Sequence, residues 1–238
     1  MTDNPAGAED AGSSRPRRLT GILRETLLIV GGALLLSLLI KTFLAQAFYI
    51  PSASMQDTLV EGDRVVVSKL TPGVFDLKRG DIVVFRDPGG WLGPGAEDES
   101  GGSVLTDVLT FVGLLPSDAG EHLIKRVIGL PEDTVECCDA QGRIRVNSSP
   151  IDEPYLKPGS VPSESDFSVI VPEGRLWVMG DNRQNSQDSR SHLGRPGGGT
   201  VPVDEVVGRA VLTMWPLDRW TVLRNPAATF EAVPEALP

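Results

Sequence analysis

The sequence predicts a mainly β protein preceded by a single N-terminal transmembrane helix. Only one long apolar run occurs, near the N-terminus, and the residues after it form short runs rich in Val and Ile, which favour strands. The 26 glycines and 19 prolines of the 238-residue chain are numerous for a helical protein and fit many turns between short strands. The length permits one generous core or two small lobes.

The N-terminal residues predict a disordered tail followed by a membrane anchor. Residues 1–24 begin with small and acidic residues, show no apolar periodicity and contain four arginines toward their end. The anchor is predicted at residues 25–47, in an apolar run of about 22 residues, which is long enough for a helix that crosses a bilayer. Because cationic flanks stay in the cytoplasm, we expect the N-terminus inside and the remainder of the chain outside.

A cleavable signal peptide is the alternative for this segment. Ala45, Gln46 and Ala47 form an A-x-A site after a charged and then an apolar stretch. The apolar region is longer than the roughly 7 to 15 residues that signal peptides have, so an uncleaved single-pass anchor is the preferred interpretation.

Short strands are predicted along the rest of the chain. The first two each follow a Gly-Asp pair and are rich in β-branched residues. An inserted loop at residues 87–122 contains apolar residues at near-helical spacing between Val104 and Leu115, which indicates either a helix packed on the core or a shallow contact with the bilayer. The predicted strands are residues 64–69, 81–85, 124–129, 143–146, 168–171, 176–179 and 206–214.

Composition excludes several classes of function. A net charge of -10 with mixed signs along the chain argues against binding DNA or RNA, whose phosphates need clustered Lys and Arg. Cys137 and Cys138 are adjacent, so they cannot connect distant parts of the fold, and we expect two thiols. No metal-binding motif occurs, so neither a metal nor another cofactor is predicted.

Candidate catalytic groups follow the anchor. Ser52 and Ser54, within the sequence PSASM, could supply a nucleophile, which needs a base. The two histidines, His122 and His192, lie in stretches typical of exposed loops. Lys125 lies inside a predicted strand, where burial among apolar side chains would lower its pKa and leave the amine neutral.

Five motifs occur in a fixed order: PSASM, GDRVVVSKL, RGDIVVF, IKRVIGLP and GDNRQNSQDSR. Together they closely resemble the sequence boxes of type I signal peptidases, the proteases that remove signal peptides from exported proteins. The resemblance runs from residue 46 to residue 214. It implies that Ser54 is the nucleophile, that Lys125 is the general base, and that the Ser52 hydroxyl joins the Ser54 backbone N–H in the oxyanion hole.

The resemblance also implies supporting residues and a substrate. Ser186 would orient the lysine amine, and Asp188 with Arg190 would hold the surrounding loop. Substrates would be preproteins with small residues at the first and third positions before the cut. The walls of the substrate pockets would be Ile50, Pro51, Met55, Leu59 and Ile124.

The family fold that the resemblance implies is a bent antiparallel β catalytic lobe with a smaller β insertion. We expect the catalytic lobe at residues 48–133 and 176–220, the insertion at 134–175 and a C-terminal tail at 221–238. Two positions depart from the family pattern: Asp57 stands where Met-x-Pro-Thr-Leu has Pro, and Glu132 stands where Gly-Leu-Pro-Gly-Asp has its second Gly. Both departures put turn geometry in doubt, and neither removes a catalytic group.

Two other functions compete with this hypothesis. A self-cleaving repressor would use the same Ser-Lys chemistry, but such proteins carry a DNA-binding module and no membrane span. A non-catalytic membrane-anchored module that binds exported chains would not need Ser54 and Lys125, yet both are present.

Overall fold

The computed structural model describes residues 15–93 and 122–236, with side chains from residue 21 onward. Within these residues the prediction of one N-terminal helix followed by mostly antiparallel β structure is confirmed. The apolar residues 104–115, predicted to form an inserted helix or a bilayer contact, lie outside the described residues. The strands are β1 (Ala45–Tyr49), β2 (Arg64–Ser68), β3 (Ile82–Arg86), β4 (His122–Gly129), β5 (Thr134–Cys137), β6 (Ile144–Val146), β7 (Ser149–Pro150), β8 (Phe167–Ile170), β9 (Arg175–Met179), β10 (Val201–Pro202), β11 (Val206–Trp215) and β12 (Thr221–Val222). The helices are α1 (Arg15–Phe43), α2 (Leu70–Gly73) and α4 (Ala227–Phe230), with short 3₁₀ helices η1 (Ala53–Met55), η3 (Arg183–Asn185), η4 (Ser189–His192), η5 (Val203–Glu205) and η6 (Leu217–Arg219).

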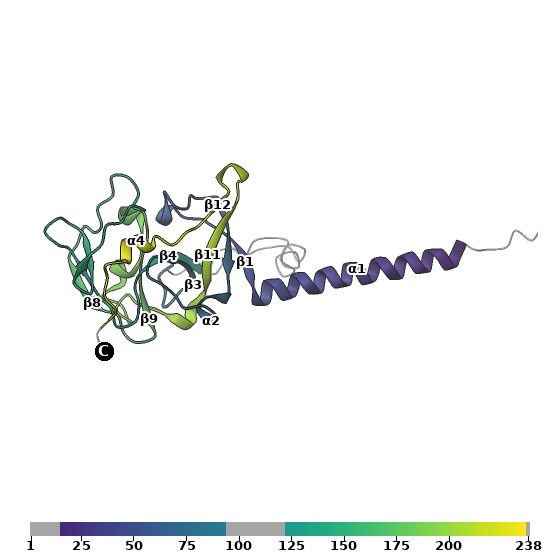
Figure 1. The fold of residues 1–238 in the computed structure, drawn as a ribbon, viewed down its shortest axis with the longest axis horizontal. Coiled ribbons are helices and arrows are strands. Elements are labelled where there is room, and N and C mark those ends of the chain that lie inside the picture. The colour runs from purple at the N-terminus through teal and green to yellow at the C-terminus, as the bar shows by residue number, and fades with distance from the viewer. Residues whose placement is uncertain (1–14, 94–121, 237–238) are drawn as a thin grey trace, which may run out of the picture.

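Helix α1 projects away from the β domain as one long rod (Figure 1). Its segment Gly21–Phe43 has 23 residues and a mean hydropathy of 2.1, so by length and composition it can cross a membrane. The helix begins at Arg15, inside the expected tail, and ends at Phe43, before the expected end of the anchor at residue 47. Residues 45–47, expected to end the anchor, instead begin strand β1. This strand pairs with β2 from Ala45↔Ser68 to Tyr49↔Arg64, so the backbone hydrogen bonds are made to β2.

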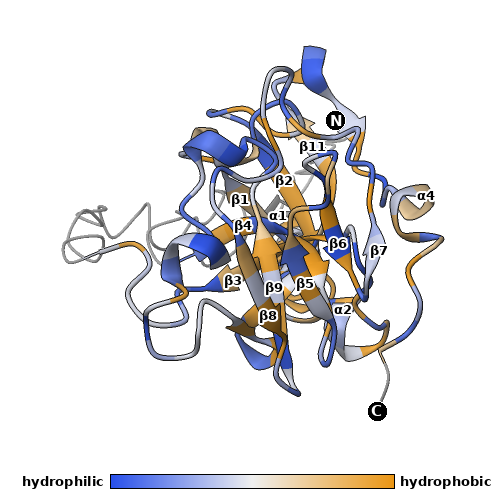
Figure 2. Ribbon diagram, turned by 90° about the vertical axis from the view of Figure 1, so that its left-hand side faces the viewer, coloured by the Kyte–Doolittle hydropathy of each residue, from blue (hydrophilic) through white to orange (hydrophobic). Residues whose placement is uncertain are grey.

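The larger sheet carries the site. Its strand order is β1-β2-β11-β3-β4-β9-β10, with β12 paired to β11, and the neighbouring strands are antiparallel. Each predicted strand has a counterpart to within two residues at either end. Strand β4 runs between β3 and β9 near the middle of the domain, where Figure 2 shows the apolar strands gathered. Strand β4 is therefore an interior strand, hydrogen-bonded to β3 on one side and to β9 on the other.

A second sheet of four strands, in the order β7-β6-β5-β8, spans residues 134–170, inside the expected insertion. Its apolar side chains, among them Val135 and Ile144, share one core cluster with Trp177 of β9. Phe230 and Val233 belong to the same cluster. The described part of the expected C-terminal tail, residues 221–236, is therefore folded onto the domain: it contributes β12 and α4, and Phe230 and Val233 cover the core that joins the sheets.

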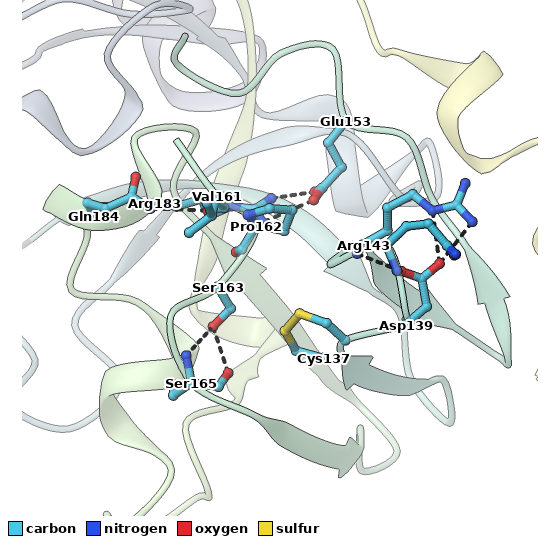
Figure 3. The surroundings of a disulfide bond; sticks show 12 residues. Cys137, Asp139, Arg143, Glu153, Val161, Pro162, Ser163, Ser165, Arg183 and Gln184 are labelled. Carbon is cyan, nitrogen blue, oxygen red and sulfur yellow. Dashed lines mark hydrogen bonds and ion pairs between the residues drawn. A yellow bond between two sulfur atoms is a disulfide. The ribbon is translucent and has the colours of Figure 1, made fainter. Parts of the chain in front are cut away.

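The two cysteines at the end of β5 are joined by a disulfide, so the expectation of two thiols is wrong. Neighbouring residues bring the sulfurs within reach of each other without any long-range contact. Figure 3 shows the bond with its surroundings, which include the Asp139–Arg143 ion pair and the loop that carries Ser163 and Ser165. Since the bond closes no loop between separate elements, it holds neither sheet to the other.

Candidate active site

Ser54 lies in η1, the tight turn that follows β1, and only 6% of the residue is exposed. The turn is closed by backbone hydrogen bonds from Gln56 N–H to the Ala53 carbonyl and from Leu59 N–H to the Met55 carbonyl. The side chains of Met55 and Leu59 are fully buried in the core beneath β1 and β2. Apolar burial therefore fixes the turn from below, while the hydroxyl of Ser54 faces β4.

Lys125 lies in β4, opposite Val83 of β3, and is 3% exposed. Its Nζ lies 2.6 Å from Ser54 Oγ and 3.1 Å from the Ile124 carbonyl oxygen. The fold thus brings together two residues that are 71 positions apart in the chain. The distance is within the range at which a general base takes a proton from a nucleophile.

Burial controls the charge of this lysine. Removal from water lowers the pKa of Lys125 from 10.5 to about 8, because the ammonium form loses its hydration. The negative charges of Asp188 and Asp181 act in the opposite direction and favour the ammonium form. Desolvation prevails, so a useful fraction of the amine is neutral near pH 8.

The structure places the other serines differently from one another. Ser52 Oγ lies 3.4 Å from Ser54 Oγ, at the exposed end of the same turn. Ser186 Oγ is buried, and its hydroxyl interacts with the Asp188 carboxylate and helps to lower the pKa of that group. The hydrogen bonds of Lys125 Nζ among the described residues do not include Ser186. The amine is held instead by Ser54 and the Ile124 carbonyl.

Asp188 and Arg190 form a two-pronged ion pair, with Arg190 Nε and Nη2 each 2.9 Å from a different carboxylate oxygen. Burial alone would raise the pKa of Asp188, but the Arg190 guanidinium and the Gly180 N–H hold it below its usual value. The same carboxylate accepts the Gly180 N–H at 3.0 Å. The pair therefore fastens the loop after β9 to the end of that strand.

A buried ion pair next to the lysine was not predicted. Arg126 points to the face of β4 opposite Lys125, and its guanidinium donates to both carboxylate oxygens of Asp181, at 2.8 and 2.6 Å. Asp181 also accepts the Thr58 hydroxyl at 2.6 Å, which links the pair to the segment after Ser54. A buried arginine needs an anion as its partner. The position of Arg126 inside an apolar strand is therefore the sequence signal that could have indicated a pairing with an acidic residue such as Asp181.

A pocket opens beside Lys125 between the end of β1 and the start of β4. Ile50, Pro51 and Ile124 line it, as the family resemblance implies, together with Ser52. Met55 and Leu59 do not line it, because the turn directs both into the core. The remaining lining residues are Phe48, Tyr49, Val84, Leu92, His122, Leu123 and Lys125.

The histidines have different environments from those expected. His192 is 3% exposed, so its assignment to an exposed loop is wrong. Its ring stacks on Trp91 with centroids 4.3 Å apart, and its Nδ1 lies 2.8 Å from the Asp188 carbonyl oxygen. His122 is half-buried in the wall of the pocket, 5.2 Å from the ring of Phe48. His192 is therefore part of the packing that supports the Asp188 loop.

Both departures from the family pattern occur at positive φ. Asp57 has φ +94°, which a proline cannot adopt because its ring holds φ near about −65°. This turn therefore differs from one that contains proline at the same position. Glu132 has φ +70°, in the left-handed region that favours glycine, the residue that the family pattern has there.

Comparisons with known proteins identify the family of this chain. The family model "Signal peptidase, peptidase S26" matches residues 23–215. The signal peptidase I of Mycobacterium tuberculosis is 37% identical, over 94% of this chain and 83% of that protein. The signal peptidase I of Leptolyngbya laminosa is 36% identical, over 86% and 85% respectively. A crystal structure of a signal peptidase I from Enterococcus faecalis aligns with 56% of this chain and 95% of its own at 26% identity, although the TM-score of 0.35 is too low to bear on the fold. The chain therefore belongs to the signal peptidase I family, the serine endopeptidases of family S26 that cleave signal peptides from exported preproteins.

Proposed function

We propose that Ser54 is the nucleophile of this peptidase and that neutral Lys125 is its general base. The observation that carries the assignment is the 2.6 Å separation of Lys125 Nζ and Ser54 Oγ in a buried site where the pKa of the lysine is lowered to about 8. A lysine of ordinary pKa would be almost fully protonated at neutral pH and could not accept the proton.

The reaction follows from this arrangement. Lys125 Nζ takes the proton of the Ser54 hydroxyl as Oγ attacks the scissile carbonyl carbon, which forms a tetrahedral oxyanion. The Ser54 N–H and the Ser52 hydroxyl donate to that oxyanion, and each such donor typically contributes about 3 kcal/mol. The C–N bond then breaks, the ammonium of Lys125 returns the proton to the leaving amine, and water hydrolyses the acyl ester with Lys125 again acting as base.

The substrates that we propose are preproteins with small residues at the first and third positions before the cut. Strand pairing beside β1 and β4 would bind the extended chain through its backbone, and the pocket next to Lys125 would select its side chains. The apolar character of Ile50, Pro51 and Ile124, which line that pocket, supports this specificity.

For the location of the chain, we propose a single pass through the cell membrane with the N-terminus in the cytoplasm and the β domain outside. The length and hydropathy of α1 support the span, and the arginines before it support the orientation. A protease that faces this side would meet the cleavage sites of exported precursors as they leave the bilayer.

The roles of Ser54 and Lys125 are tested by cleavage of a precursor with the full chain in detergent. Ser54→Ala and Lys125→Ala each abolish cleavage and leave the circular dichroism spectrum unchanged. Ser165→Ala and Lys78→Ala, which alter exposed residues of the same two types, retain wild-type turnover. Normal turnover by Lys125→Ala would refute the lysine mechanism, and a wild-type protein that binds precursors without cutting them would favour the non-catalytic module.

A further inference from the structure

Asn182, in the loop that follows β9, forms hydrogen bonds to η1, the turn that carries Ser54. The residue is 3% exposed. Its backbone N–H donates to the Ser54 carbonyl at 3.0 Å. Its side-chain amide donates from Nδ2 to the Ala53 carbonyl, also at 3.0 Å. One residue therefore holds the two consecutive peptide units that flank the Cα of Ser54, although it lies well over a hundred positions away.

The bond to the Ala53 carbonyl has a chemical consequence. The Ala53 C=O and the Ser54 N–H belong to one planar peptide unit, so a hydrogen bond that fixes the oxygen also fixes the direction of the N–H. The Ala53 oxygen accepts the Gln56 N–H at 3.0 Å as well, which uses its second lone pair. Two donors on the oxygen polarise the peptide and make its N–H a stronger donor.

The loop that carries Asn182 is itself held rigidly close to the turn. A Cβ atom at Gly180 would lie 2.5 Å from the Ser54 carbonyl oxygen, so only glycine permits this approach. The next residue, Asp181, is fixed by Arg126 and by the Thr58 hydroxyl. The position of the Asn182 amide is therefore set before any substrate binds, as stabilisation of a transition state requires.

We infer that Asn182 is a positioning residue for the oxyanion hole, acting through the Ala53–Ser54 peptide, whose N–H donates a hydrogen bond to the oxyanion. The inference rests on the proposed roles of Ser54 and Lys125. Asn182 has no charge and its described contacts do not include the lysine, so its effect belongs to the oxyanion and not to the protonation of the base.

Two variants separate this role from simple packing. Asn182→Ala removes the side-chain donor, and Asn182→Leu removes it while keeping a branched side chain of similar size; both retain the backbone N–H. We expect kcat for a precursor peptide to fall on the order of tenfold to hundredfold, less than or equal to the loss that follows removal of an oxyanion donor. We expect KM to stay within about threefold, because ground-state binding does not use the oxyanion contact.

A peptide aldehyde and the pH profile provide readouts that a merely structural role would not produce. The aldehyde forms a tetrahedral adduct with Ser54, so its affinity falls by the same factor as kcat/KM, while the affinity of the carboxylate product of the same sequence is unchanged. The acid limb of the pH profile keeps its wild-type midpoint. Gln184→Ala, which alters an exposed amide of the same loop, leaves all of these quantities unchanged.

Several results would overturn the inference. These are a kcat within twofold of wild type, equal losses of affinity for aldehyde and product, a displaced acid limb, or a loss of activity that follows the folded fraction measured by circular dichroism. Wild type and Ser54→Ala are assayed in parallel. Failure of wild type to cleave, or cleavage by Ser54→Ala, would count against the proposed function itself, whereas the outcomes above count against Asn182 alone.

Discussion

The lowered pKa of Lys125 makes activity depend on pH in a form that separates a buried lysine from an exposed one. With a pKa of about 8, roughly a tenth of the amine is neutral at pH 7 and roughly nine tenths at pH 9. We therefore expect kcat/KM to rise about tenfold between these values and to level off above pH 9. With the ordinary pKa of 10.5, the rise over the same interval would be about a hundredfold and no plateau would appear.

The assay is cleavage of a fluorogenic precursor peptide by the full chain in detergent, with kcat/KM measured from pH 6 to pH 10.5. Exposure to each pH is followed by return to pH 8, so that irreversible inactivation is detected separately. A profile that still rises tenfold per unit at pH 9.5 would refute the lowered pKa. A profile that falls from neutral to mildly alkaline pH would refute the lysine base.

The lowered pKa of Lys125 also predicts that this residue decreases the free energy of unfolding when it is protonated. Between pH 8 and 10.5 the unfolded chain holds more protons at this site than the folded chain does, so stability rises with pH over that interval. Below pH 8 the folded state carries the full cost, about 3 kcal/mol for a shift of this size. Lys125→Met should therefore raise the free energy of unfolding near pH 7 by up to about 3 kcal/mol while abolishing cleavage. An unchanged or lower stability would contradict the desolvation argument.

Three further predictions concern the groups around the lysine. Asp188→Asn removes a charge that favours the ammonium form, so the acid limb of kcat/KM should move below pH 8, and a shift to higher pH would contradict this. Asp181→Asn leaves Arg126 buried without its counter-ion and should lower the free energy of unfolding by about 3 to 5 kcal/mol in a denaturant titration, whereas a loss under 1 kcal/mol would show that the pair is dispensable. Glu132→Gly relieves a left-handed backbone and should change stability by between zero and about +1 kcal/mol, while Glu132→Val should destabilise; equal stabilities would remove the strain argument.

The strands could be predicted from the sequence because local signals and tertiary structure agree there. Runs of β-branched residues bounded by Gly-Asp turns gave β2 and β3 close to their observed ends. The end of α1 could not be predicted, because Ala45–Tyr49 follows the apolar helix without a glycine, proline or other helix-stop signal. Only pairing with β2, which no local pattern reveals, makes those residues a strand.

The motifs predicted which residues belong to the candidate site. They did not predict how all of these side chains are arranged in space. Ser54 and Lys125 lie together as their motifs imply, but Met55 is buried in the core with Leu59, and no local sequence pattern shows this. The partnership of Arg126 with Asp181 joins residues 55 positions apart. Such a pairing depends on which face of β4 meets the loop after β9, and that register is set by the whole sheet.

The boundary between α1 and β1 also determines how the candidate active site is held relative to α1. The Leu44 N–H continues the helical pattern by donating to the Ile40 carbonyl, and the Leu44 carbonyl accepts the Lys69 N–H at the end of β2. One residue therefore carries the hydrogen bonds of the helix into those of the sheet, with no flexible linker between them. Strand β1 then advances about 3.3 Å per residue toward the turn that carries Ser54. Because pairing with β2 keeps β1 extended along its full length, the length of β1 and of the turn after it sets the separation of Ser54 from the end of α1.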